Sequence, residues 1–267
     1  MEILSDGTIL NEGSLDKLQP IFKELVEEST NRILSGFKPL AIYLRGSLSD
    51  GKGIKSLSDI DLVVFIESKP NKNEKDKVLQ IIDSLESDFS VVSEVDITLL
   101  NYDLLMSSEY KRLRVYLKTQ SCLLYGNDVL SNIKDFKADK DLAHFMYSNI
   151  KTELSDLHSY FKGYGSRSYL SRVRKPRFWC RWTMRTILRS GLGLVMYKKP
   201  VYTPNLHTCA KILSEEFPDL AVDIKKILEY EMDPINNKDQ IRLFLDNFLP
   251  KYFPLWDNVL KIFRTNR

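Results

Sequence analysis

Apolar residues in the first 130 positions of the chain recur with two different periods, one typical of helices and one typical of strands. Apolar positions three or four residues apart predict a helix over residues 16–35, with Pro20 in its first turn and Gly36 at its end. Residues 60–66 are apolar at nearly every position, which predicts a strand buried on both faces. The same two patterns predict strands over 40–44, 91–100 and 122–125, and helices over 74–85 and 104–118.

Only helical patterns follow after Gly126. The dipeptide Thr203-Pro204 predicts a helix start, because a hydroxyl cap is followed by proline at the first helical position. The expected helices cover residues 139–163, 176–197, 205–216, 219–231 and 238–263. The sequence therefore predicts an α+β protein, with a sheet-containing domain over residues 1–130 followed by an all-α domain over residues 131–267.

The composition excludes several classes of protein. Hydrophobic residues make up 43% of the chain and charged residues 28%, as expected for a globular protein with a real core. No apolar run approaches the ~20 residues that span a bilayer, and no secretory signal is visible, so we expect a cytoplasmic location and no membrane partner. Three distant cysteines favour reduced thiols, and three histidines without metal-ligand spacing disfavour a zinc site.

Two aspartates open the apolar segment at residues 60–66. Asp59 and Asp61 are two positions apart, so on a strand both carboxylates point to one face, about 6.6 Å apart along the chain. Two such carboxylates repel one another unless a cation lies between them. Asp96 stands alone among aliphatic and β-branched residues of the next predicted strand, where burial without a partner would be costly. Three hard oxygen ligands suit Mg²⁺, and they predict the two-metal geometry used for in-line phosphoryl chemistry.

A glycine and a serine end the strand that precedes these aspartates. Gly46 lets backbone N–H groups approach an anion closely, and Ser47 adds a hydroxyl donor. A lone Asp-x-Asp is common in soluble chains and is a weak sign of a site. The order strand, Gly-Ser, loop, Asp-x-Asp, strand, and then a further strand with an isolated aspartate is much rarer by chance. It predicts phosphate binding at Gly46 and Ser47 and metal binding at Asp59, Asp61 and Asp96.

The segments Gly46-Ser47-Leu48-Ser49-Asp50-Gly51 and Ser58-Asp59-Ile60-Asp61-Leu62-Val63-Val64 resemble the catalytic motif of the nucleotidyltransferase superfamily, which includes DNA polymerase β. Within it, the chain is similar to aminoglycoside 3″(9)-adenylyltransferases of the streptomycin/spectinomycin type. Residues 121–126 resemble the strand that ends their catalytic domain, and residues 189–198 resemble part of their helical domain. The resemblance implies a nucleotidyltransferase domain with a small mixed sheet flanked by helices. It also implies transfer of AMP from ATP to a hydroxyl of a small acceptor, such as an antibiotic.

Each residue of the motif receives an expected role. Asp59 and Asp61 hold one Mg²⁺ that binds the ATP phosphates, and a second Mg²⁺ helps to activate the acceptor hydroxyl. Gly46 and Ser47 position the β- and γ-phosphates. Asp96 is either a ligand of the second metal ion or the base that takes the acceptor proton, and both roles stay open.

Basic residues gather without acids between Lys162 and Lys199, a stretch with eleven Lys and Arg residues and no Asp or Glu. Such a concentration of like charge repels itself unless something anionic binds. The resemblance implies that cations of the helical domain contact the ATP phosphates, which arginine can grip with two parallel bonds. The residues predicted to do so are Arg185, Arg189 and Lys198. A solvated charged face and a contact with RNA are the alternatives for this stretch.

Three functions are weighed. The first is an adenylyltransferase that acts on a small hydroxylated molecule. The second is a nucleotidyltransferase that acts on tRNA, other RNA or protein in the manner of a toxin, which the basic stretch favours because aminoglycosides are themselves polycations. The third is a non-catalytic nucleotide-binding module, against which the complete set of aspartates argues. The expected partners are a nucleoside triphosphate and either a small hydroxylated acceptor or RNA.

Overall fold

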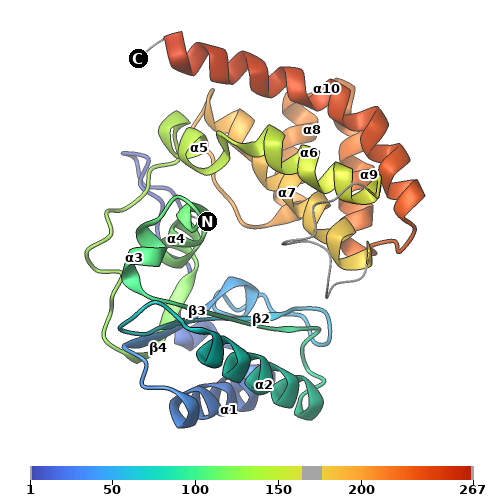
Figure 1. The fold of residues 1–267 in the computed structure, drawn as a ribbon. Coiled ribbons are helices and arrows are strands. Elements are labelled where there is room, and N and C mark those ends of the chain that lie inside the picture. Colours follow the sequence, from blue (N-terminus) through green and yellow to red (C-terminus); the bar gives the residue numbers. More distant parts are fainter. Residues whose placement is uncertain (1, 164–175, 266–267) are drawn as a thin grey trace. The chain divides into compact units, whose positions relative to one another are not determined.

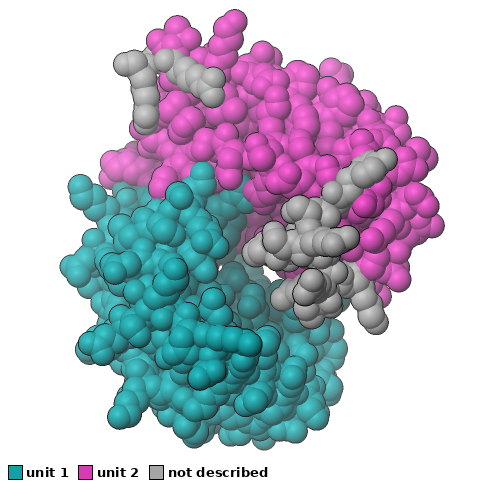
Figure 2. Space-filling model, in the orientation of Figure 1, with its two compact units in different colours: residues 1–4, 8–136 teal, residues 5–7, 137–267 magenta. Residues whose placement is uncertain are grey.

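The computed structural model describes residues 2–163 and 176–265. Contacts within the chain divide it into two compact units, which are coloured separately in Figure 2. The first, which we call the sheet unit, comprises residues 1–4 and 8–136, and the second, the helical unit, comprises residues 5–7 and 137–267. The division at 136/137 lies later than the predicted boundary at residue 130, because Leu130 and Ile133 belong to a hydrophobic core of the sheet unit.

Four strands form a single mixed sheet in the sheet unit (Figure 1). They are β1 Ala41–Arg45, β2 Ile60–Phe65, β3 Val95–Leu100 and β4 Ser121–Gly126. The spatial order is β3-β2-β1-β4, in which β1 is antiparallel to β2 and β4, and β2 is parallel to β3. All four predicted strands form. Strand β3 begins at Val95 instead of residue 91, because Val91 and Ser93 form hydrogen bonds with the loop between β1 and β2. Ser56 N donates to Val91 O, and Ser93 N donates to Ser58 O.

The alternation of side chains along β2 builds one core on each face of the sheet. Ile60, Leu62 and Val64 pack on the face that helices α1 (Pro20–Gly36) and α2 (Lys72–Asp88) cover (Figure 1). Val63 and Phe65 pack on the opposite face, toward helices α3 (Tyr102–Met106) and α4 (Lys111–Thr119). The strand is therefore buried on both faces, as its continuous apolar pattern predicts.

Local capping explains where the helices of the sheet unit begin. Pro20 occupies the first turn of α1, as predicted. Asn71 and Glu74 form a capping box at the start of α2. The single helix predicted over 104–118 is two helices, because Asn101 caps α3 by accepting from Leu104 N, and Ser107 ends that helix in an extended conformation.

Six α-helices build the helical unit within the described residues: α5 Lys140–Tyr147, α6 Ile150–Phe161, α7 Pro176–Met196, α8 Leu206–Glu216, α9 Ala221–Met232 and α10 Lys238–Thr265. The predicted helix over 139–163 is divided into α5 and α6 at Ser148 and Asn149. The predicted start at Thr203-Pro204 is wrong. Asn205 caps α8 instead, because its Oδ1 accepts from Thr208 N at 2.9 Å, so the helix begins at Leu206.

Helix α7 is the centre of the helical unit and packs against the five other helices. Two glycines allow this close packing. A Cβ at Gly191 would lie 2.6 Å from Leu213 Cδ1, and a Cβ at Gly193 would lie 2.6 Å from Tyr147 Cδ2. Among the helices of residues 2–163 and 176–265, none has the length and apolar character needed to cross a bilayer.

Acids from outside α7 pair with its arginines. Nε of Arg181 lies 3.2 Å and Nε of Arg185 lies 2.8 Å from Oε1 of Glu231, a residue of α9 that is only 6% exposed. Arg177 Nη2 lies 3.2 Å from Asp233 Oδ1, just after α9. The self-repulsion expected of the basic stretch is therefore partly offset, because segments distant in sequence supply acids that the stretch itself lacks.

Replacement of Glu231 with glutamine should destabilise the helical unit. The change removes a buried charge that two guanidinium groups share. Because both arginine side chains are one quarter exposed, we expect a loss of about 1–3 kcal/mol, less than the ~3–5 kcal/mol of a fully buried pair. All three tryptophans (Trp179, Trp182 and Trp256) lie in the helical unit. Urea unfolding followed by tryptophan fluorescence therefore measures this loss.

Asp233→Asn is the matched control for this experiment. Asp233 pairs with Arg177, which lies on α7 as Arg181 and Arg185 do. The side chain of Asp233 is 92% exposed and that of Arg177 is 60% exposed. An exposed pair contributes little, so the expected change is below about 0.5 kcal/mol. Equal effects of the two substitutions would contradict the role of Glu231 as a buried counter-ion.

Candidate active site

One row of residues crosses all four strands of the sheet. In the parallel β2–β3 pair, Asp61 lies directly opposite Asp96. In the two antiparallel pairs of β1, Arg45 lies opposite Asp61 on one side and opposite Ser121 on the other. The order across the sheet is Asp96, Asp61, Arg45, Ser121, with neighbouring strands about 4.8 Å apart. The strand register thus brings together two of the predicted metal ligands, which the sequence separates by helix α2.

The row lies where the apolar packing of one sheet face ends. Asp61 shares its face with Val63, and Arg45 shares its face with Tyr43, because side chains two apart on a strand point the same way. Val63 and Tyr43 are buried in the core on the α3 and α4 side. The side chains of Asp61 and Arg45 are 15% and 21% exposed. Asp59 directly precedes β2 and is also partly buried.

The carboxylate of Asp61 is contacted from two sides. Arg45 Nη2 donates a hydrogen bond to Asp61 Oδ1 at 2.8 Å. On the other side lies Gly46, whose φ of +77° is in the left-handed region that favours glycine. A Cβ at Gly46 would lie 2.9 Å from Asp61 Oδ2, so only glycine lets the backbone pass this close to the carboxylate. Sequence reasoning identified Asp61 and Gly46 but missed Arg45, whose signal was a basic residue at the end of an apolar strand.

Residues Gly46–Leu48 form a short 3₁₀-helix, η2, which starts the loop between β1 and β2. Ser49 is fully buried, and its hydroxyl donates to Gly46 O at 2.9 Å or Gln120 O at 3.0 Å. Gly46 N also donates to Gln120 O. Ser47 is a predicted phosphate ligand, and its hydroxyl has no hydrogen-bond partner among the described residues. The backbone carbonyl of Ser47 accepts a hydrogen bond from Lys52 N. The loop backbone is therefore held, and the Ser47 hydroxyl is available to a ligand.

A segment near the N-terminus contacts this loop and the start of β4, and sequence reasoning missed it. Asn11 exchanges two hydrogen bonds with the backbone of Ser121, donating from Nδ2 at 2.8 Å and accepting at Oδ1 at 3.2 Å. Gln19 Nε2 donates to the carbonyls of Gly51 and Gly53, at 2.7 and 3.1 Å. Asn and Gln are ordinary in turns and at helix starts, so no local pattern marked these two as supports.

Lys52 ties the loop to the same segment by charge. Its Nζ lies 2.9 Å from Asp50 Oδ2 and 3.0 Å from Glu12 Oε2. Burial acts to lower the pKa of Lys52, but the hydrogen bonds and charges of the two carboxylates outweigh it and raise that pKa above its ordinary value. Lys52 therefore stays charged at neutral pH and links Glu12 to the loop.

The donor atoms around the row fit a hard divalent cation. Asp59, Asp61 and Asp96 bring three negative charges against the single positive charge of Arg45, a formal balance of −2. Carboxylate oxygens are the ligands that Mg²⁺ prefers in proteins. In the part of the chain that the structure describes, no three His, Cys, Asp or Glu side chains converge as a formed metal site. Asp61 is instead engaged by Arg45.

The three cations predicted to contact ATP phosphates lie in the helical unit. Arg185 pairs with Glu231, as described above, and Lys198 Nζ lies 2.6 Å from Oε1 of Glu216 on α8. Arg189 is partly buried on α7. Two of the three therefore already have a carboxylate partner within their own unit. Four other members of the basic stretch lie outside the described residues: Arg167, Arg172, Arg174 and Lys175.

The cysteines are not candidates for nucleophilic catalysis. Burial raises the pKa of the Cys122 and Cys180 thiols to about 11, and that of Cys209 to about 12. All three thiols are free, as predicted, and they stay protonated at neutral pH.

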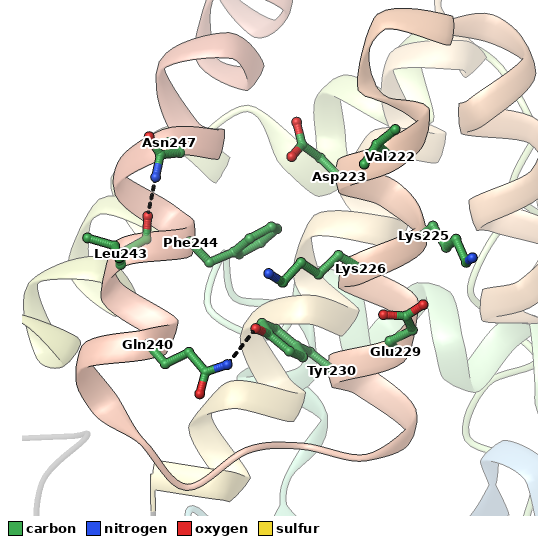
Figure 3. Close-up of a pocket in the computed structure, with 10 residues that line it drawn as sticks. All are labelled: Val222, Asp223, Lys225, Lys226, Glu229, Tyr230, Gln240, Leu243, Phe244 and Asn247. Atoms are coloured by element: carbon green, nitrogen blue, oxygen red, sulfur yellow. Dashed lines mark hydrogen bonds between the residues drawn. The ribbon is translucent and has the colours of Figure 1, made fainter.

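A cavity of about 550 Å³ lies between α9 and α10 of the helical unit (Figure 3). Lys226 extends across it, with Nζ 5.4 Å from the ring centroid of Tyr230 and 5.8 Å from that of Phe244. Gln240 donates to the Tyr230 hydroxyl at 3.2 Å. These contacts hold the two helices together. Neither the Gly-Ser loop nor an aspartate of the row lines this cavity, so we do not assign transfer chemistry to it.

One known protein family matches part of the chain. Residues 24–113 match the family model described as a nucleotidyltransferase domain. The matched segment contains β1, β2 and β3, and hence Gly46, Ser47 and the three aspartates. No curated protein matches the chain.

Two solved structures are similar to different extents. The crystal structure of spectinomycin adenyltransferase AAD(9) from Enterococcus faecialis with ATP and spectinomycin has a TM-score of 0.56 and 12% sequence identity. The matched region covers 88% of this chain and 98% of the AAD(9) chain. At 12% identity the similarity concerns the fold alone. A crystal structure of a toxin-antitoxin with AMP-PNP is 21% identical over 51% of this chain and 93% of its own. Its TM-score of 0.30 is too low to carry an argument.

Three of the four strands of the sheet, the Gly-Ser loop after β1 and the three aspartates at β2 and β3 therefore lie within the matched segment. Residues 24–113 therefore match a nucleotidyltransferase domain, and the chain shares its fold with a solved adenyltransferase.

Proposed function

We propose that the chain is a metal-dependent nucleotidyltransferase that transfers AMP from ATP to a hydroxyl group of a small-molecule acceptor. The observation that carries this proposal is the row in which Asp61 stands opposite Asp96 and against the backbone of Gly46. Carboxylates beside a phosphate-binding loop are what a site for a triphosphate and its metal ions needs. The similar fold of AAD(9), solved with ATP and spectinomycin, supports ATP as the donor and a small molecule as the acceptor.

Each part of the site receives a role in this proposal. Asp59 and Asp61 would hold two Mg²⁺ ions, which when bound would neutralise charge on the triphosphate and favour loss of the acceptor proton. The backbone of Gly46 and the hydroxyl of Ser47 bind the β- and γ-phosphates. Asp96 either holds a metal ion or accepts the proton of the acceptor hydroxyl. Positioning and charge neutralisation suffice for the reaction, so no covalent enzyme intermediate is needed.

Ion pairs in the helical unit favour a small acceptor over RNA. An RNA site needs cations that are free to neutralise phosphates. Arg177 pairs with Asp233 and Arg181 with Glu231, so cations of the basic stretch that are not assigned to ATP are already partly neutralised. A purely non-catalytic nucleotide-binding module has no need of three aspartates at one end of a sheet.

A transfer assay tests the proposed function directly. The purified full chain is incubated with Mg²⁺ and labelled ATP, CTP, GTP or UTP, together with an antibiotic panel, total tRNA or a protein lysate. We expect label to pass from ATP to a small hydroxylated molecule. Transfer to tRNA or protein alone would contradict the small acceptor, and absence of transfer with every donor and acceptor class would contradict the activity.

Asparagine at Asp59, Asp61 or Asp96 should abolish transfer. The change keeps the shape of each side chain and removes its charge, and we expect turnover to fall by roughly a hundredfold or more. Asp96→Asn removes the like charge opposite Asp61, so its melting temperature should stay level or rise. Asp61→Asn also deprives Arg45 of its partner, which offsets that gain. Turnover and thermal melting are the measurements, and near wild-type turnover in these variants would contradict the assignment.

ATP binding should depend on Mg²⁺. Three carboxylates near a triphosphate repel it unless cations intervene, so calorimetry should detect tight ATP binding only with the metal present. Mg²⁺ and ATP together should also raise the melting temperature, because a ligand that binds the native state stabilises it. Equal ATP affinity with and without Mg²⁺ would count against a metal site at the row.

We further propose that Arg185, Arg189 and Lys198 contact the ATP phosphates. Alanine at each position should weaken ATP binding by roughly ten- to a hundredfold, the size of a charge-assisted contact. Arg177→Ala is the matched control, because Arg177 lies on the same helix in an exposed pair with Asp233. Calorimetry compares the four variants. If all four bind ATP like the wild type, these cations do not contact the ATP phosphates.

A further inference from the structure

Arg45 occupies a central place in the row, yet the proposed reaction has no role for it. It is the last residue of β1 and lies directly opposite Asp61, with Nη2 2.8 Å from Asp61 Oδ1. The two side chains are 21% and 15% exposed, so the pair is largely shielded from water. Shielding strengthens an electrostatic contact relative to one on the open surface. Arg45 therefore neutralises one of the carboxylates that the proposed function assigns to the metal.

The charges of the row explain why a cation is needed there before any ligand arrives. Asp61 faces Asp96 across the parallel pair, and like charges directly opposite one another destabilise a sheet. Asp59 adds a third carboxylate two positions before Asp61. The antiparallel pairing of β1 with β2 places the guanidinium of Arg45 beside Asp61.

The hold of Arg45 on Asp61 is limited. Asp61 Oδ1 is its one hydrogen-bond acceptor among the described residues. Its Nε is buried without a hydrogen-bond partner there. A guanidinium carries five N–H donors, and its strongest contacts with an anion are bidentate. A single bond to Asp61 leaves donors for a second anion.

We propose that Arg45 is a built-in counter-ion that competes with the metal for Asp61 and thereby couples metal binding to nucleotide binding. This inference rests on the proposed function of the site. In the metal-free protein, Arg45 neutralises Asp61, so a metal ion alone binds weakly. Triphosphate oxygens are acceptors that a guanidinium binds well, and a guanidinium that turns to them frees Asp61 for the cation. Metal and nucleotide therefore bind with positive coupling, each raising the affinity for the other by the same factor.

Titration of the nucleotide-free full chain with Mn²⁺ tests the proposal, with free Mn²⁺ measured by electron paramagnetic resonance at one pH and ionic strength. Arg45→Met removes the charge and keeps most of the side-chain length. The fold should hold, because the buried Nε has no bond to lose and the only hydrogen bond removed is the one to Asp61. We expect Mn²⁺ to bind on the order of tenfold more tightly than to the wild type, the effect of losing one charged competitor. ATP should then raise Mn²⁺ affinity by a smaller factor than in the wild type.

Two variants serve as controls. Arg45→Lys keeps the positive charge and should retain the weak Mn²⁺ binding of the wild type. Arg32→Met removes an arginine of similar exposure, 24%, from α1, where it pairs with Glu28 at 2.8 Å and Asp88 at 2.7 Å, away from the row. It should leave Mn²⁺ affinity unchanged, which separates a local competitor from a general change in net charge.

Several outcomes would overturn the proposal. Unchanged Mn²⁺ affinity in Arg45→Met would mean that Arg45 does not compete, and weaker affinity would mean that it instead helps to hold the metal ligands. If Arg45→Met does not fold, Arg45→Gln takes its place, because it also removes the charge, and unchanged or weaker Mn²⁺ affinity there would refute competition. Tenfold tighter binding to Arg45→Lys, which retains the charge, would refute it as well.

Failure of this proposal and failure of the proposed function are distinguishable. If Asp59→Asn and Asp61→Asn still abolish Mn²⁺ binding in the presence of ATP, the metal site stands whatever Arg45 does. If the wild type binds no Mn²⁺ at the protein either with or without ATP, the proposed function itself fails.

Discussion

Two carboxylates that face each other on adjacent parallel strands require positive charge nearby, and the whole site is arranged around this requirement. Parallel pairing puts Asp61 and Asp96 at the same level of the sheet. Antiparallel pairing makes β1 end where β2 begins, which brings Arg45 and the turn at Gly46 to the same carboxylate. A mixed sheet therefore allows the two acids, the positive charge of Arg45 and the loop backbone at Gly46 to meet at one end of neighbouring strands.

The position of the Gly46 loop depends on residues that take no part in the proposed chemistry. The buried hydroxyl of Ser49 and the N–H of Gly46 both bond the carbonyl of Gln120, just before β4. Asn11 bonds the backbone of Ser121, and Gln19 holds two carbonyls farther along the loop. These contacts use backbone groups that would otherwise be unsatisfied. Contacts from two other stretches of the chain thus hold the loop, and the preorganisation that the proposed transfer needs would rest on them.

Charge in the helical unit is balanced in space and not along the chain. Helix α7 carries arginines at four-residue intervals without an acid of its own, and Glu231 on α9 receives two of them while nearly buried. This pairing gives α7 and α9 a specific register, since an unpaired buried carboxylate would be costly. Part of the positive charge that suggests nucleic-acid binding is therefore already paired with an acid of the helical unit.

Local order in the sequence determined the succession of helices and strands and predicted Gly46, Asp59 and Asp61 as site residues. Periodicity, capping and motif spacing each depend on neighbours a few residues away, so they can be read from the chain alone. The tertiary structure alone decided that Arg45 faces Asp61 and that Glu231 joins the arginines of α7. Those contacts depend on strand register and helix packing, in which every segment chooses among many distant partners according to the burial and charge of the whole fold.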